Sequence, residues 1–372
     1  MGNEVMLDGI QLPLLREAAA QTLAGWTQMD LIVNRRDTLK LALGAPLILA
    51  AERTLGGTAR TLGSSTKGFD TDTVTALEEV TRFFAGADAS RGGGLYRSAI
   101  VAQLAEVARR IQDGVPPSLK TRVFAATADL AALAGWASHD CGRYAQAQRY
   151  WTYGVYAATE AGQPDRGVEI VTRMSHQMIY LGHPKDALGL LGIAAQKATL
   201  PSTKALVASQ TGRVHAALGN RHESEQHLTQ ADQLLADGLV HTPDWVAYFD
   251  PAEHAGARAV SARDLTALDG RHDRASTHFH DALQLRRPGF DRVKVMDRIG
   301  LAAALFEEGE VEQGVTAAHQ ALAEAARIDS ALVASRLNTL LDAARYYDST
   351  AVKDVHSRAR ELTTARPTSI AA

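Results

Sequence analysis

LAALAGWASHDCGRYAQAQRYWTYGVYAATE, residues 130–160, is the stretch that decides the fold. The small residue Gly135 is followed seven positions later by Gly142, and glycine is the residue found most often just after the end of a helix. Ala147 and Trp151 then follow at helical spacing, which places them on one face of a second helix. The stretch therefore predicts two antiparallel helices that are separated at Gly142 and pack closely through small side chains.

The same pattern recurs from about residue 119 to residue 328. Turn glycines are expected at Gly142, Gly182, Gly219, Gly270 and Gly309. Three positions beyond each glycine stay in phase, and in chain order the residues five, nine and twelve places on are Ala147, Trp151 and Gly154; Ala187, Leu191 and Ala194; Ser224, Leu228 and Ala231; Ala275, Phe279 and Ala282; and Gly314, Ala318 and Ala321. One helix pair cannot bury its apolar stripe alone, so neighbouring pairs must stack. The prediction is an all-α fold, a tetratricopeptide-like α-solenoid of antiparallel helix pairs.

Four segments are expected along the chain. Residues 1–69 combine an N-terminal helix over about 12–26, an Arg35-Arg36 pair before a short apolar run, and a linker rich in Gly, Ser and Thr. Residues 70–118 form a helical lead-in, residues 119–328 the repeats, and residues 329–372 C-terminal capping helices and a tail. The twin arginine resembles a twin-arginine export signal, but an intracellular linker is the favoured interpretation. The expected location is the cytoplasm, with export as the alternative and no membrane insertion.

Composition and motifs argue against several function classes. The formal net charge of −3 gives no strong basic footprint for nucleic acid. A lone Cys141 excludes an internal disulfide and a cysteine zinc site. The chain has no HExxH motif, nucleophile elbow, phosphate loop or dinucleotide fingerprint. We therefore expect no enzyme, no cofactor and no metal site.

Binding residues are expected on the first helix of each pair, because in this repeat type that helix lines the concave face. Aromatic side chains supply contact area there, and arginine can clamp a carboxylate. Counting back from each turn glycine gives, from the first to the fourth unit, Trp136, His139 and Asp140; His176 and Tyr180; Arg213; and Asp264. The expected ligand is a peptide or protein partner in the concave groove. The alternative that Trp136 and Tyr180 pack against a neighbouring repeat stays open.

An insertion before the fourth turn, residues 241–254, holds the densest aromatic group. Trp245, Tyr248 and Phe249 are spaced i, i+3 and i+4, which would place them on one helix face. A structural wedge between the third and fourth repeats is the favoured interpretation. They are also retained as candidates for one wall of the binding groove.

Several segments together carry a family resemblance: GGGLYRSAIVAQL, LAGWASHDCGRYAQAQRYW, YLGHPKDAL, ALGN and DWVAYFDPAEHAG. Over about residues 70–350 the chain resembles the C-terminal tetratricopeptide sensor region of helix-turn-helix transcriptional regulators of the Cro/repressor type. The resemblance implies that the repeats bind a signalling peptide or partner protein and act in transcriptional regulation.

The N-terminal part departs from this family pattern. Residues 1–33 are too few for a complete helix-turn-helix domain ahead of Arg35, so direct DNA binding is doubtful. Two alternatives to a sensor protein stay open: a DNA-binding regulator that acts through residues 1–40 as a dimer, and a binding protein exported through the twin-arginine route. Homodimerisation is compatible with each of them.

Overall fold

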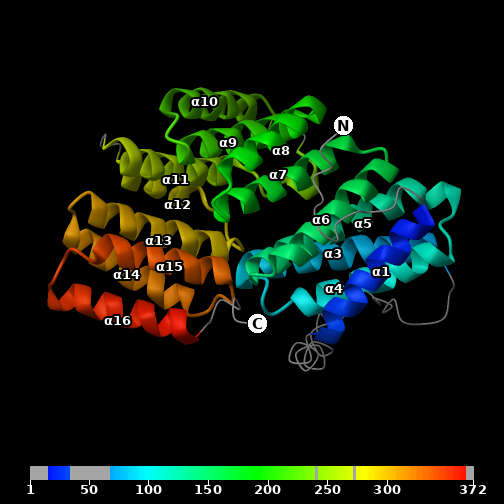
Figure 1. Cartoon of the computed structure of the whole chain (residues 1–372), viewed down its shortest axis with the longest axis horizontal. Helices are drawn as coiled ribbons and strands as arrows, with labels where there is room; N and C mark the ends of the chain where they lie inside the picture. The colour runs from blue at the N-terminus through cyan, green and yellow to red at the C-terminus, as the bar shows by residue number, and fades with distance from the viewer. Residues whose placement is uncertain (1–15, 34–67, 239–241, 271–273, 366–372) are drawn as a thin grey trace, which may run out of the picture. The chain divides into compact units, whose positions relative to one another are not determined.

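The structure is a computed structural model that describes residues 16–33, 68–238, 242–270 and 274–365 (Figure 1). These residues form fifteen α-helices and no strand, so the predicted all-α fold is confirmed. Arg35-Arg36, the apolar run after it and most of the predicted linker lie outside the described residues.

The chain divides into two compact units. Unit 1 comprises Met1–Ala85, Leu95–His139 and Arg143–Ile170, and unit 2 comprises Gly86–Gly94, Asp140–Gly142 and Val171–Ala372. The predicted segments 1–69 and 70–118 both supply helices to unit 1.

Unit 1 contains α1 and several further helices, of which α3, α5 and α7 belong to it only in part. The helices are α1 (Arg16–Val33), α3 (Thr71–Arg91), α4 (Arg97–Asp113), the short 3-10 helix η1 (Pro117–Leu119), α5 (Lys120–Asp140), α6 (Tyr144–Glu160) and the start of α7 (Pro164–Tyr180). Helix α1 continues to Val33, beyond the predicted end at about residue 26. It packs mainly on α4 and also on α6, with Leu23 and Trp26 buried.

Helices α5 and α6 pack as closely as the opening stretch predicts. A Cβ atom on Gly135 would lie 2.4 Å from Trp151 Cδ1, so only glycine allows this approach. The Trp151 indole N–H donates to the carbonyl oxygen of Ala132 at 3.1 Å. Gly142 has a φ of 74°, in the left-handed region that glycine adopts without strain.

Unit 2 repeats one motif, a first helix followed by a tight turn and a second helix that packs back on it (Figure 1). The second part of α7 is followed by α8 (Pro184–Lys197), α9 (Pro201–Ala217), α10 (Arg221–Gly238), α11 (Pro251–Asp269), α12 (Ala275–Leu285), α13 (Asp291–Glu307), α14 (Val311–Ala325), α15 (Ala331–Ala344) and α16 (Thr350–Ala365). The first helices α9, α11, α13 and α15 also contact one another in that order.

The phased positions of the sequence are core positions. All five predicted turn glycines have φ between 68° and 83°. Nine residues beyond each turn, Trp151, Leu191, Leu228, Phe279 and Ala318 are at most 3% exposed. The spacing of small and apolar residues therefore predicts the repeat phase correctly. Gly162 and Gly289 also have positive φ, although the repeat pattern does not mark them.

The prediction that the aromatic residues of the insertion share one helix face is wrong. Residues Asp244–Val246 form a short 3-10 helix, η3, and the next residues form a turn. Phe249 is 4% exposed and packs with Leu206, Leu235 and Val246, while Trp245 and Tyr248 pack partly buried against this group. The aromatic residues share a small core without sharing a helix face.

A buried ion pair joins two short segments of the chain to α13 within unit 2. The Arg292 guanidinium lies 3.0 Å from Asp88 Oδ2 and 3.2 Å from Asp140 Oδ2. Gly93 N–H and the Ser330 hydroxyl also donate to Asp140. Residues 86–94 and 140–142, which include Asp88, Gly93 and Asp140, belong to unit 2.

Candidate binding site

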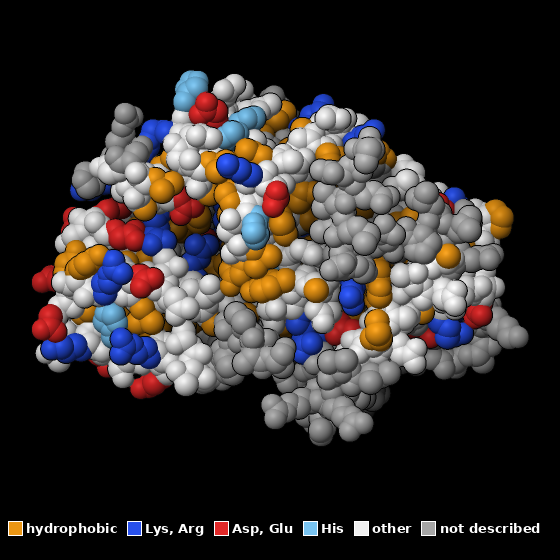
Figure 2. All heavy atoms as spheres, in the orientation of Figure 1, with side chains coloured by type: hydrophobic (Ala, Val, Ile, Leu, Met, Phe, Trp, Pro, Cys, Tyr) orange, Lys and Arg blue, Asp and Glu red, His pale blue; other side chains and the backbone are white. Residues whose placement is uncertain are grey.

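Three arginines from three first helices of unit 2 interact electrostatically. We call Arg213 of α9, Arg263 of α11 and Arg336 of α15 the arginine cluster. Figure 2 shows a recess between the positions of α11 and α13 where basic and acidic side chains gather. The inner face is defined here as the surface around this cluster, contributed by α7, α9, α11, α13 and α15.

The three arginines differ in how far their donors are used. Arg263 makes a two-pronged ion pair with Glu307, at 2.8 Å and 2.6 Å. Arg213 lies 3.2 Å from His176 Nδ1 through one guanidinium nitrogen. Since a guanidinium only donates, His176 Nδ1 must accept and this imidazole carries its proton on Nε2. Arg336 makes no hydrogen bond and no ion pair with any residue that the structure describes.

Burial leaves the charges of this site incompletely compensated. Burial, together with the like charges of Arg213 and Arg263, lowers the pKa of Arg336 to about 10. Burial also lowers the pKa of Arg213. Both groups stay charged at neutral pH, but burial has removed much of the water that would otherwise stabilise their charge.

Asp264 is the acidic member of the site. It is partly buried beside the arginine cluster and makes no hydrogen bond within the described residues. Burial raises its pKa, while Arg213, Arg336 and Arg263 act in the opposite direction. Its carboxylate therefore balances part of the positive charge from a distance rather than through a direct ion pair.

A fourth arginine nearby is held by two carboxylates. Arg286 donates to Asp297 at 2.7 Å and to Glu253 at 2.6 Å, and its side chain is 3% exposed. Gly256 makes room for it, since a Cβ there would lie 2.8 Å from the guanidinium. Burial raises the pKa of Asp297 to about 6, even though Arg286 acts to lower it. This group joins α11 to α13, and its arginine is committed to these two acids.

The structure brings together three of the predicted binding residues, one from each of three successive first helices. His176 of α7 contacts Arg213 of α9, and Asp264 of α11 interacts with Arg213 through space. Tyr180 ends α7 and is partly buried.

Two predicted binding residues are corrected by their burial. His139 has no exposed surface and packs between the rings of Trp136, Tyr144 and Trp151 in unit 1. Asp140 is equally buried, and it forms an ion pair with Arg292 and accepts a hydrogen bond from the Ser330 hydroxyl. Neither side chain lies on an exposed strip. Counting back from a turn glycine gives the helix position but not the long-range partner that covers it.

One contact of the insertion with α7 is made by Tyr248. Tyr248 is partly buried and packs under the guanidinium of Arg173, which lies 4.9 Å from the ring centre. Trp245 is partly buried beside it, and Phe249 belongs to the small core around Leu206 and Val246.

Two members of the site are not predicted by the sequence pattern. Arg263 directly precedes the predicted Asp264 but is not reached by counting back from the turn glycine. Arg336 lies in a helix assigned to the C-terminal cap, where no turn glycine fixes the phase. The signal that could have found Arg336 is the recurrence of arginine in the first helices of unit 2.

A Ser-His-Asp chain of contacts links α9, α10 and α11. Ser209 Oγ lies 2.8 Å from His254 Nδ1, and His254 Nε2 lies 2.9 Å from Asp232 Oδ1. Ser209 is 2% exposed in the middle of α9, so it cannot reach a substrate as a nucleophile. Burial lowers the pKa of His254. The three groups therefore connect helices.

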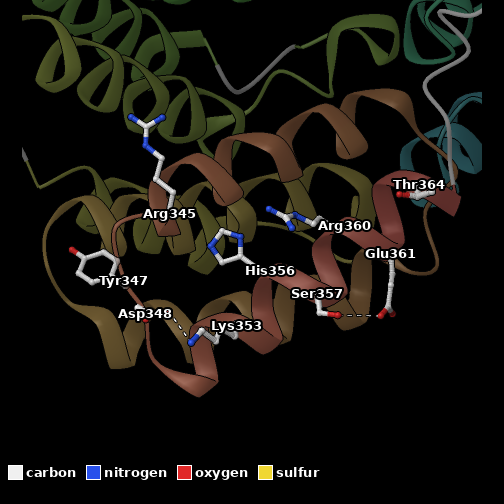
Figure 3. A pocket seen from close by; sticks show the side chains of 9 residues that line it. All are labelled: Arg345, Tyr347, Asp348, Lys353, His356, Ser357, Arg360, Glu361 and Thr364. Atoms are coloured by element: carbon white, nitrogen blue, oxygen red, sulfur yellow. Dashed lines mark hydrogen bonds and ion pairs between the residues drawn. The ribbon is translucent and has the colours of Figure 1, made fainter.

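A shallow depression of about 880 Å³ lies along α15 and α16 (Figure 3). Arg345, Lys353 and Arg360 are exposed, and their side chains point in different directions rather than toward one centre. Lys353 pairs with Asp348 at 2.8 Å at one end of the depression. The depression offers no converging polar groups.

Comparison with known proteins gives no relative: no family model matches the chain, and no curated protein or solved structure does. Within the described ranges, no group of three or more His, Cys, Asp or Glu side chains could hold a metal ion. None of the described helices is both long enough and apolar enough to cross a membrane.

Proposed function

We propose that this protein is a non-enzymatic regulatory protein of the tetratricopeptide type, which binds a peptide or protein partner on the inner face of unit 2. We place it in the cytoplasm and in transcriptional regulation, as the family resemblance of its sequence implies. The observation that carries the proposal is the meeting of His176, Arg213 and Asp264, one side chain from each of three successive first helices.

The chemistry of this surface suits an extended chain. The site runs across neighbouring helices, so a ligand must contact several of them in succession. Its side chains offer donors at Arg213 and Arg336 and an acceptor at Asp264, which match the groups of a peptide. Arg173 over Tyr248 adds a flat amphipathic platform.

Direct DNA binding is not part of the proposal. Helix α1 holds a single basic residue, Arg16, and its apolar face is buried on α4. A helix that enters the major groove needs several basic and polar side chains on its free face.

The test is a selection of random dodecapeptides on the full-length protein, followed by affinity measurement with synthetic peptides. The variant His176→Ala/Arg213→Ala removes the inner-face pair. The matched control is His319→Ala/Arg358→Ala, which removes a histidine–arginine contact of 2.8 Å between α14 and α16, both second helices.

We expect the inner-face variant to bind selected peptides about 10-fold more weakly or worse, because charged hydrogen bonds are lost. The control variant should bind like the wild type. Equal losses in both variants, or none in either, would reject the inner face as the binding surface.

A further inference from the structure

The inner face has unused donors at one place. Arg336 has five N–H donors and gives none to the described protein, while Arg213 gives one to His176. The nearby acids Glu307, Asp297 and Glu253 are already taken by Arg263 and Arg286. The site is therefore rich in donors and poor in acceptors.

We propose that Arg213 and Arg336 together bind the side-chain carboxylate of one acidic residue in the partner peptide, an inference that rests on the proposed function. Guanidinium groups form planar, two-pronged contacts with carboxylates. Arg213 and Arg336 are both partly exposed, so a ligand can reach them. Arg213 and Arg336 come from different helices, so one carboxylate can be held from two sides.

The acids of the site restrict the neighbouring residues of the peptide. Asp264 has no hydrogen-bonded partner among the described residues and interacts with the whole arginine cluster. Counted together with Arg286, four arginines face the four carboxylates of Asp264, Asp297, Glu253 and Glu307. These charges cancel, so the donors of Arg213 and Arg336 can take one carboxylate, whereas the further acids of an acidic run would meet repulsion from the Asp264 carboxylate.

The electrostatic state of the free site is consistent with this assignment. The lowered pKa of Arg336 reflects a buried charge with two like-charged neighbours. A bound carboxylate would restore the missing compensation and raise that pKa.

The experiment uses a selected peptide that has an amidated C-terminus, so only its side chains carry acid. Three forms are compared: one acidic residue, the same position changed to its amide, and three consecutive acidic residues. A fourth form with a free C-terminal carboxylate and no acidic side chain distinguishes the two carboxylate sources. Binding is measured to wild type, Arg336→Gln, Arg336→Lys, Asp264→Asn and the control Arg345→Gln, an exposed arginine at the rim of the α15–α16 depression.

We expect the acidic form to bind wild type about 10-fold or more better than its amide, and better than the triple acid. Arg336→Gln should lose this preference, Arg336→Lys should keep part of it, and Arg345→Gln should keep all of it. Asp264→Asn should improve binding of the triple acid. The comparison of peptide forms on wild type does not depend on whether any variant folds.

Four results would overturn the inference: selected peptides that all lack acidic residues, an amide form that binds as well as the acid, an Arg336→Gln variant that retains the preference, or a free C-terminus that alone accounts for binding. If the inner-face double variant still weakens binding in those cases, the proposed function stands without this inference. If no peptide is selected at all, both fail.

Discussion

At the scale of single residues, the absence of one Cβ atom sets the distance between α5 and α6. Gly135 lets the Trp151 ring lie directly on the backbone of α5, where the indole N–H also finds the Ala132 carbonyl. The same device recurs in unit 2, where Gly300 of α13 lies against Phe279. Small residues facing a large apolar side chain are visible in the sequence, and this is why the pairing could be predicted.

Gly135→Ala should destabilise the protein by about 2–3 kcal/mol, because the new methyl overlaps a fully buried tryptophan that cannot move away. The measurement is the free energy of unfolding by denaturant. Gly25→Ala is the matched control: Gly25 is exposed in α1 with no atom within 4 Å of the new Cβ, and alanine should stabilise it by about 0.5–1 kcal/mol. Equal effects of the two changes would contradict close packing at Gly135.

Asp297 predicts an unusual pH dependence. Burial raises the pKa of Asp297 to about 6. The protonated carboxyl therefore contributes to the free energy of unfolding below about pH 4, and this contribution is lost as the pH rises through 6. Asn at this position cannot ionise, and Arg286 keeps Glu253 as a partner. The stability of Asp297→Asn relative to wild type should therefore rise between about pH 4.5 and 7.5, by about 2 kcal/mol.

The measurement for Asp297→Asn is denaturant unfolding of both proteins at several pH values. The exposed Asp348→Asn serves as the control and should show a flat difference over this window, because the pKa of Asp348 is lowered by Lys353. If the stability of Asp297→Asn relative to wild type instead fell with rising pH, the effect of Arg286 on the pKa of Asp297 would outweigh that of burial.

At the scale of helices, α1 is held on unit 1 by a buried polar group as well as by apolar side chains. Asp30 accepts from Arg97 of α4 and from the Tyr150 hydroxyl of α6, and Arg97 also donates to Ser138 at 3.0 Å. Asp30 is 6% exposed. The sequence indicates a helix near this position but not its docking surface, because the partners lie 67 and 120 residues away.

Asp30→Ala should cost about 3–5 kcal/mol, since it leaves the buried Arg97 charge without its carboxylate. Hydrogen exchange measured by mass spectrometry should show faster exchange in α1 and α4. Thr22→Ala is the control in the same helix, because its hydroxyl only bonds the backbone carbonyl of Ala18. Unchanged exchange in α1 after Asp30→Ala would mean that apolar packing alone holds the helix.

The insertion shows where periodicity fails to predict an element. Spacing of i, i+3 and i+4 is typical of a helix face, yet Pro243 and Pro251 leave only seven residues between them. A segment so short buries its apolar side chains through a 3-10 turn and a local core. Periodicity over fewer than two turns carries little weight against proline positions.

At the scale of the whole molecule, chain order does not follow the compact units. Residues 86–94 and 140–142 belong to unit 2, and Asp140 is the residue that holds Arg292, Ser330 and Gly93 together. Its partners lie 152, 190 and 47 residues away. Local spacing places Asp140 on an exposed strip because such distant partners leave no trace in a repeat pattern.

Asp140→Ala should destabilise unit 2 by about 3–5 kcal/mol, because Arg292 and the Gly93 N–H lose a buried acceptor. Two measurements test this: the thermal unfolding of the protein, and the rate of hydrogen exchange in α13. Asp348→Ala, at an exposed ion pair, should leave stability nearly unchanged. A small effect at both positions would show that Asp88 alone can hold Arg292.

The most direct test of binding on the inner face is hydrogen exchange of the full-length protein with and without a saturating selected peptide. We predict slower exchange in the first helices α9, α11 and α15, around Arg213, Asp264 and Arg336, with α10, α12 and α16 unchanged. Protection confined to the second helices, or to the α15–α16 depression, would contradict binding on the inner face.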